Sequence, residues 1–330
     1  MLTGKTTANQ PLLKKHAMND QAVSPLIPKV FRFTDIDEFR SAIRNLNVDF
    51  TPLVRQISAG QTILSLPGCD INLVKSFPRI IDAQLAPNTM AVGFTMDDGI
   101  PMRVNGVERD HNALVFGANG AIYSAVERVA REYVSLMFAP PIENRGWPET
   151  GSNFQLYEIS PQAQERLRKL VTEILFVSPT LADSSDVPGA ASAMRESVLA
   201  AVDAAFSAMV SARWTRQANS ARQFKIFQTI REILASNIQN PIYSADLARE
   251  LGVSVRTIHD SVLRFRGISL HRYLRLRRLW LVRQRLLTGQ QSVKASALAC
   301  GFWHLSDFAQ SYRQHFGETP SQTLARARKH

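Results

Sequence analysis

The sequence predicts an α+β fold, with an N-terminal antiparallel β-barrel or sandwich, a helical hairpin, and then an all-α domain with two helix-turn-helix units. Three observations support this prediction. Between residues 50 and 138, short apolar or alternating runs are separated by Gly, Pro, Asn and Asp, which is typical of antiparallel sheets. Two amphipathic helical stripes follow before residue 210, and the C-terminal third carries helical periodicity throughout. The 330 residues are enough for two separate cores.

The N-terminal region divides into a tail and a strand-rich domain. Residues 1–28 are polar with scattered prolines, and we expect a flexible tail there. Residues 35–43 predict a short helix, with Ile36, Phe39 and Ile43 on one side. The strand-rich domain is expected over residues 29–155, and its expected strands lie at 53–57, 62–66, 71–75, 79–85, 90–96, 113–117, 123–129 and 133–138.

A helical hairpin and linker are expected over residues 156–220. The first stripe begins near residue 161, residues 178–190 read as a linker, and the second stripe follows. Its apolar members are Met194, Val198, Val202, Phe206 and Met209. Packing on the sheet and a homodimer interface both explain this stripe, so the sequence leaves the alternatives open.

The positive charge of the chain is concentrated at one end. The net charge is +11, yet residues 221–330 hold 18 Lys and Arg against 6 Asp and Glu, a net +12. This polarity predicts a polyanionic partner, nucleic acid or an anionic membrane surface. No apolar run approaches a membrane span, and the first 20 residues lack a signal-peptide core. A cytoplasmic protein without a membrane partner is therefore expected.

The basic third contains one motif twice. In the first copy, Leu247 and Ala248 belong to a first helix, Gly252 makes a turn, and Ser254 precedes a second helix as its N-cap. The second copy has Ala297 and a Gly-Phe break, followed by Phe308, Tyr312 and Phe316 at four-residue spacing, with His304, Ser306, Gln310 and Arg313 on the opposite face. A repeated helix–turn–helix in a basic region favours a DNA reader over an ordinary αα-hairpin.

An arginine-rich helix of about 18 residues is expected between the copies, about 27 Å long at 1.5 Å per residue. Such a rod would hold two recognition helices about 34 Å apart, one turn of B-DNA. Some of its arginines would contact phosphates and others would lie beside the core.

The residues from 224 to 327 resemble the AraC family of bacterial transcriptional regulators. The marks are "LARELGVSVRTI", "GISLHRYLRLRRL" and "ALACGFWHLSDFAQSYRQHFGETPSQTL". The wording of the last is most similar to the subset containing the ethanolamine-operon regulator, and the strand-rich part resembles the AraC-type effector-binding domain more weakly. The resemblance implies a transcription factor that binds double-stranded DNA, RNA polymerase and an unknown small-molecule effector. It does not indicate the operator or whether the protein activates or represses.

The resemblance also places the DNA contacts. Base readers would be Arg256, His259, Asp260, His304, Ser306 and Gln310. Phosphate contacts would be Ser254, Thr257, Arg275, Arg283 and Arg313. Arginine is common in the family where this chain has Asp260 and Gln310, so its target sequence is open. Each of the two histidines is either a base contact or a polar surface residue, whereas Trp303 is interpreted as a packing or helix-positioning residue and not as a base contact.

Enzymatic function is not expected, because the chain lacks nucleophile-elbow, phosphate-loop and dinucleotide-binding motifs. No cofactor is expected. Between residues 31 and 220 the only histidine is His111, so no metal site is expected either. Arg55, Arg79 and Arg103 either bind an anionic effector or pair with acids of their own domain. Cys69 and Cys300 are expected to be reduced packing residues. A non-specific nucleic-acid-binding or architectural protein is the alternative function.

Overall fold

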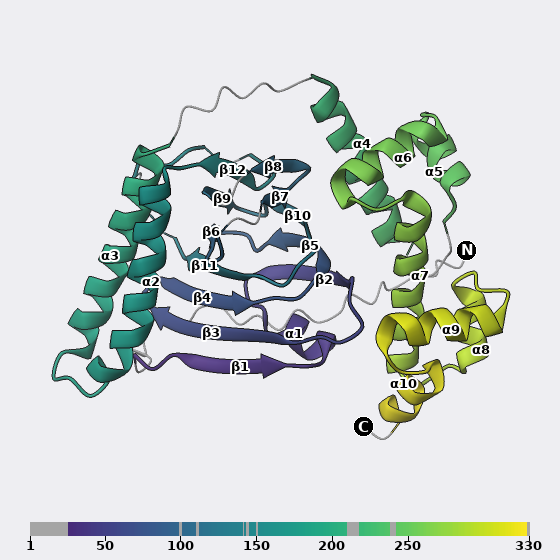
Figure 1. Ribbon diagram of the computed structural model, residues 1–330, viewed down its shortest axis with the longest axis horizontal. Helices are drawn as coiled ribbons and strands as arrows, with labels where there is room; N and C mark the ends of the chain where they lie inside the picture. Colours follow the sequence, from purple (N-terminus) through teal and green to yellow (C-terminus); the bar gives the residue numbers. More distant parts are fainter. Residues whose placement is uncertain are drawn as a thin grey trace, which may run out of the picture.

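The computed structural model describes residues 26–98, 101–109, 112–140, 142, 145–149, 151–209, 218–237 and 242–328. A β-rich part with two long helices lies on one side and an all-helical part on the other (Figure 1). Residues 1–25 of the expected tail lie outside the described residues. Among the helices described, none is both long and apolar enough to cross a membrane. The predicted α+β class is confirmed.

The strands form two antiparallel sheets stacked as a sandwich, without closing into a barrel. The seven-stranded sheet runs in the order β1 (Lys29–Phe33), β3 (Ala59–Leu66), β4 (Cys69–Lys75), β11 (Glu132–Phe138), β6 (Met90–Thr95), β9 (Ala113–Ala118) and β12 (Gln155–Glu158). The five-stranded sheet runs in the order β2 (Leu46–Pro52), β5 (Arg79–Leu85), β10 (Ile122–Glu127), β7 (Met102–Val104) and β8 (Val107–Arg109).

The prediction of a strand at residues 53–57 is wrong, because a bent segment occupies these residues. Strand β2 precedes it and ends at Pro52, which has no N–H to donate to a ladder. The backbone of Leu53 instead donates to Pro78, at 2.9 Å. The short helix expected near residue 36 is confirmed as α1 (Ile36–Ala42), with Asp35 as its N-cap.

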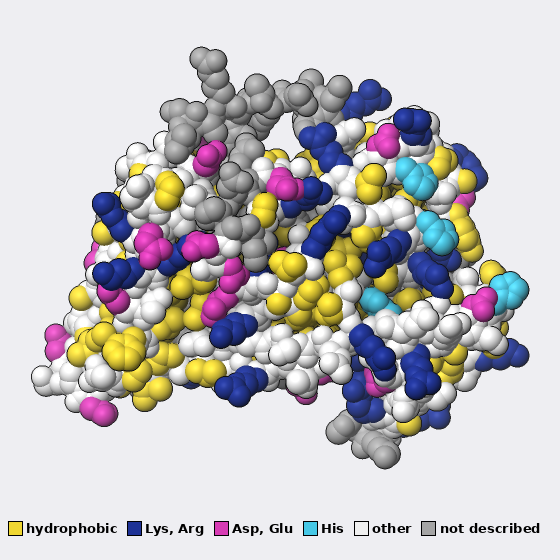
Figure 2. Space-filling view, viewed as in Figure 1, with side chains coloured by type: hydrophobic (Ala, Val, Ile, Leu, Met, Phe, Trp, Pro, Cys, Tyr) yellow, Lys and Arg dark blue, Asp and Glu magenta, His cyan; other side chains and the backbone are white. Residues whose placement is uncertain are grey.

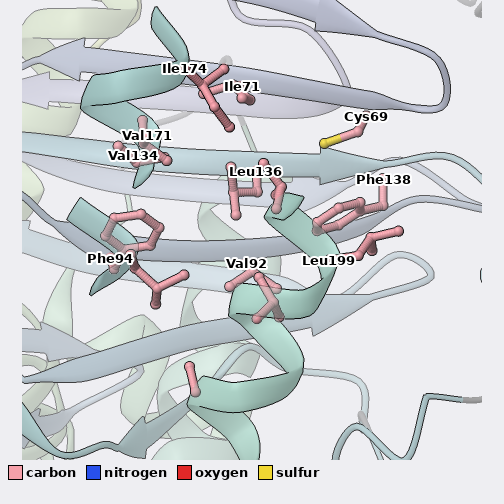
Figure 3. Packing of buried hydrophobic residues seen from close by; sticks show 14 of the residues in the cluster. Cys69, Ile71, Val92, Phe94, Val134, Leu136, Phe138, Val171, Ile174 and Leu199 are labelled. Atoms are coloured by element: carbon pink, nitrogen blue, oxygen red, sulfur yellow. The ribbon is translucent and has the colours of Figure 1, made fainter. Parts of the chain in front are cut away.

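The helical hairpin covers the outer face of the seven-stranded sheet. Helix α2 (Pro161–Leu181) is capped by Ser160 and helix α3 (Val187–Ser207) by Asp186. Figure 3 shows side chains of both helices, such as Val171 and Leu199, packed among strand residues. The expected linker is too long, because α2 continues through Pro179 in its last turn and α3 begins at Val187.

The apolar stripe of α3 faces this core. Val202 is fully buried and Phe206 is 4% exposed. The ring of Phe206 lies 5.3 Å from Phe116 and 5.6 Å from Trp147, between centroids. Of the two explanations for the stripe, packing on the sheet is the one that the structure shows, and Val202 and Phe206 are not available to a second copy of the chain.

The C-terminal part contains helices α4 (Ala218–Ser236), α5 (Ser244–Leu251), α6 (Val255–Arg266), α7 (Leu270–Leu287), α8 (Val293–Ala299), α9 (Leu305–Phe316) and α10 (Pro320–Ala327). Helix α7 supplies side chains to two apolar clusters. Leu270 and Tyr273, near its start, pack with α4, α5 and α6. Val282 and Leu286, near its end, pack with α8, α9 and α10. The connecting rod is therefore confirmed as an 18-residue helix shared by both cores.

Phe206→Ala should lower the free energy of unfolding by about 3–5 kcal/mol, because it leaves a cavity among aromatic rings. Chemical denaturation would measure the loss. Phe176→Ala is the control, since Phe176 is 81% exposed on the same hairpin, and we expect a change within about 0.5 kcal/mol. An equal effect of the two substitutions would contradict the internal position of the stripe.

Candidate nucleic-acid interface

The first unit has the geometry expected of a helix-turn-helix. Helix α5 ends at Gly252, whose φ of 61° is left-handed and suits glycine. The Ser254 hydroxyl accepts a hydrogen bond from the Thr257 N–H at 3.1 Å and so starts α6. Ile258, Val262 and Phe265 are buried. Their burial turns the opposite face of α6 to solvent.

That opposite face carries the predicted base readers of the first unit. The Arg256 side chain is 89% exposed, and its Nε lies 3.8 Å from a carboxylate oxygen of Asp260, whose side chain is 57% exposed. His259 is half-buried beside them. The pairing orients Arg256 and gives Asp260 a partner one helical turn away. The structure thus brings the three predicted readers together on one exposed surface.

The second unit repeats the arrangement. Ala297 is fully buried where the helices cross, and Gly301 makes the turn with a φ of 78°. Phe308 and Tyr312 are buried on the inner face of α9, while Phe316 is half-buried. The predicted readers of this unit, His304, Ser306 and Gln310, are all exposed.

Four predicted phosphate contacts lie on or beside these surfaces. Ser254 is exposed and Thr257 half-buried at the start of α6, and Arg313 is exposed in the last turn of α9. Arg275 is exposed on α7 and donates to the hydroxyl of Ser311 on α9, which fixes the second unit against the rod. Figure 2 shows many Lys and Arg side chains over the C-terminal helices.

Arg283 does not fit its predicted role. Its side chain is 6% exposed, and it forms ion pairs with Glu318, in the turn before α10, and with Asp35 and Asp37 around α1, at 2.5, 3.7 and 4.0 Å. An arginine buried between three carboxylates has no free donor face for phosphate. In this conformation Arg283 joins the second unit to the β-rich part instead.

Arg283 is one of several arginines that enter the interface between the two parts. Asp82 on β5 receives both Arg266, which is fully buried at the end of α6, and Arg231 of α4, whose Nε lies at 2.7 Å. Arg277 of α7 pairs with Asp49 on β2. The sequence analysis missed these partners, although Asp49 and Asp82 could have drawn attention as acids within otherwise apolar strands.

Two opposing effects set the protonation of Asp82. Burial alone would raise the pKa of its carboxyl, but the guanidinium groups of Arg266 and Arg231 outweigh burial and hold the pKa below its ordinary value. Asp82 is therefore ionised at neutral pH, and its single negative charge stabilises both guanidinium groups where the helical part meets the sheet.

The inner side of the same sheet faces a cavity. Between the two sheets lies a space of about 110 Å³, lined mainly by apolar side chains. Its polar lining residues include Gln61, Asn72, Arg79, Glu127, Tyr133, Arg44 and Arg131. Along β5, Arg79, Ile81 and Ala83 line the cavity, whereas Ile80 and Asp82 contact the helical part. One strand layer therefore separates the cavity from the helical part.

The three arginines predicted to bind an effector do not form one site. Arg79 lines the cavity, but it is fully buried, pairs with Glu127 at 3.2 Å and donates to the Tyr133 hydroxyl at 3.1 Å. Arg103 pairs with Glu108 and donates to the Arg264 carbonyl on α6, at 3.5 Å. Arg55 is exposed and its Nε would lie 3.2 Å from a Cβ added at Gly317. Arg55 and Arg103 thus lie at the domain interface, outside the cavity.

Cysteine and metal chemistry add little to this picture. Cys69 and Cys300 are buried free thiols, as expected. Burial raises the pKa of both thiols, so neither is a ready thiolate. Within the described ranges there is no group of three or more His, Cys, Asp or Glu that could hold a metal ion.

The comparisons with known proteins agree with this geometry. Residues 247–326 match a helix-turn-helix domain family. The XylDLEGF operon transcriptional activator 3 of Pseudomonas putida is 33% identical over 103 residues, which cover 30% of this chain and 31% of that protein. The virulence regulon transcriptional activator VirF of Yersinia enterocolitica is 40% identical over 75 residues, which cover 23% and 28%. The chain thus matches about a third of the length of these curated relatives.

A solved structure of a probable AraC family transcriptional regulator from Rhodopseudomonas palustris is 36% identical, covering 31% of this chain and 97% of that one, with a TM-score of 0.29. Two helix-turn-helix units with exposed second helices define a helix-turn-helix domain in the basic C-terminal part. In this domain, the chain is similar to AraC family transcriptional regulators.

His315 makes the second unit sensitive to acid. Burial, with Arg283 and Arg272 nearby, lowers the pKa of His315 to about 4. An unfolded chain binds a proton at this histidine near pH 6.5, so the free energy of unfolding should fall as pH drops from about 6.5 to 4, by on the order of 3 kcal/mol. Denaturation at a series of pH values would measure this.

His315→Gln should flatten that pH dependence, whereas His271→Gln, at an exposed position on α7, should leave it unchanged. The same acid sensitivity in His315→Gln as in the wild type would show that another group is responsible.

Proposed function

We propose that this protein regulates transcription by reading operator DNA with α6 and α9 together, in response to a small molecule bound between its two sheets. The observation that carries the proposal is the exposure of both recognition surfaces while their opposite sides are fixed by shared cores and by the β-rich part. The rod α7 spans about 27 Å over its 18 residues. This length suits two helices in successive major grooves on one face of the duplex.

The reading roles follow from the chemistry of each side chain. Arg256 would donate two hydrogen bonds to guanine O6 and N7, and Asp260 would accept one from cytosine N4. Gln310 would form hydrogen bonds with adenine N6 and N7. The shorter side chains of His304 and Ser306 would form further hydrogen bonds with base edges. His259 completes the first surface. Phosphates would be held by Ser254, Thr257, Arg275 and Arg313, and RNA polymerase is the further partner that the family suggests.

Arg256→Ala in the full-length protein should cost about 1–3 kcal/mol at the selected operator and relax preference at one base pair. Competition binding against single-base operator variants measures both effects. Arg313→Ala is the matched control, because removal of a phosphate contact should weaken all sequences alike and lower the salt slope by about one. Uniform weakening by Arg256→Ala would instead favour the non-specific, architectural alternative.

Effector sensing is supported by the position of the cavity. Strands β2, β5 and β10 alternate, so that Phe50, Ile81 and Tyr123 line the cavity while Asp49 and Ser124 accept from Arg277 and Arg266. A ligand that enlarges the cavity must displace these strands. Because backbone and side chains of a strand move together, the displacement would reach the arginines that hold the helical domain.

The docked arrangement depends on close approach as well as charge. The Phe265 ring lies over Gly106, where an added Cβ would be 2.0 Å from a ring carbon. Arg128 donates to the Gly267 carbonyl at 2.7 Å, and Gln228 donates to Asn153 at 2.8 Å. The β-rich part thus holds α6 of the first unit and the neighbouring helix α4, which connects the β-rich part mechanically to a proposed DNA reader.

Asp82→Asn should weaken this docking, because Arg266 would remain buried without its counter-ion, a change that typically costs about 3–5 kcal/mol. We expect a lower free energy of unfolding and a larger radius of gyration by small-angle scattering. Glu173→Gln is the control, since Glu173 belongs to an exposed pair with Lys169 at 3.9 Å. Unchanged stability and dimensions in Asp82→Asn would remove the proposed connection.

A further inference from the structure

The second unit exposes two large apolar side chains at the start of its recognition helix. Trp303 is 70% exposed and Leu305, the first residue of α9, is 36% exposed. Trp303 was expected to be a packing or helix-positioning residue, and its exposure excludes the packing role. Exposed Trp is unusual because the indole buries a large apolar area when it has a partner. This surface has no cover among the described residues.

The turn before α9 explains why these side chains point outward. Phe302 is anchored by its ring, 5.0 Å from that of Phe308, and the guanidinium of Arg278 lies 5.9 Å from its centroid. His304 then has an extended backbone, with φ of −99° and ψ of 97°, and its side chain makes no cap hydrogen bond. With Phe302 fixed inside, Trp303 and Leu305 lie at the end of the helix that enters a major groove.

The chemistry of this surface differs from that of the first unit. Arg256 supplies the first unit with a cation at the start of α6. The first two turns of α9 carry no Lys or Arg, and their exposed polar side chains are Ser306, Asp307 and Gln310. Asp307 can only accept hydrogen bonds when ionised. The bidentate guanine contact typical of arginine is therefore absent from this part of the second unit.

We propose that Trp303 and Leu305 contact the 5-methyl groups of thymine, so that the second unit selects A·T pairs while the first selects guanine. The thymine methyl is the apolar group that base pairs display in the major groove. Gln310, one turn along α9, is suited to the adenine of such a pair. This inference rests on the proposed DNA-reading function and assigns a base class to each half of the operator.

The test uses the full-length protein and a duplex selected from a random library. Each thymine in the selected site is replaced in turn by deoxyuridine, which lacks only the methyl group. Arg256→Ala relaxes selection in the half-site of α6, and the other half-site is assigned to α9. There, one or two replacements should weaken wild-type binding roughly fourfold each, the value of one buried methyl group.

In Leu305→Ala and Trp303→Ala, thymine and deoxyuridine should bind equally at those positions. Arg256→Ala should keep the deoxyuridine penalty, and so should Phe176→Ala, which removes an exposed aromatic far along the chain on α2. Both apolar positions are exposed, so thermal melting should confirm that the variants fold normally.

The outcomes separate this inference from the proposed function. If a specific site is selected but deoxyuridine binds as well as thymine throughout the α9 half-site, the thymine assignment is wrong while DNA reading stands. The same conclusion follows if both alanine variants keep the full penalty. If no sequence is enriched from the library, the proposed function itself fails.

Discussion

The buried ion pairs of Asp82 determine how the two parts of this protein meet. A single carboxylate on β5 holds two guanidinium groups, one from α4 and one from α6. Burial of the Arg266 cation is costly unless a counter-ion lies at contact distance, so α6 can pack against the sheet here only because the acid is present. Other contacts, such as that of Phe265 with Gly106, complete the interface.

The interface shows that part of the positive charge of the C-terminal third pairs with acids of the β-rich part. The net +12 of the C-terminal third suggested a surface devoted to a polyanion. Arg231, Arg266, Arg277 and Arg283 instead face Asp82, Asp49, Asp35 and Asp37. A net charge counts residues along the chain and cannot distinguish a cation that binds DNA from one that binds another domain. The arginines left for DNA are those whose exposed faces lie on α6, α9 and the adjacent part of α7.

Local features of the fold were predictable from the sequence, and long-range ones were not. The turn at Gly252, the cap at Ser254 and the inward stripe of α6 follow from spacing alone, because helical periodicity and capping are properties of neighbouring residues. The role of Arg283 depended on Asp35, nearly 250 positions away in the chain, and no local pattern encodes that contact. The exposure of Trp303 could not be predicted for a related reason, since only the anchoring of Phe302 decides which of two adjacent aromatics packs inward.

If the protein reads DNA as proposed, helix α7 has a consequence for the architecture of its operator. The start of α7 packs in one apolar core and its end in the other. The two recognition helices therefore cannot rotate or slide relative to each other without disrupting one of these cores. One base pair inserted between the half-sites turns them by about 34° around the duplex axis. Two units joined by a flexible linker could still bind both half-sites after such an insertion. In this protein, one of the two recognition helices would no longer reach its major groove. Its target sites in a genome should therefore share a constant spacing even where their individual bases vary.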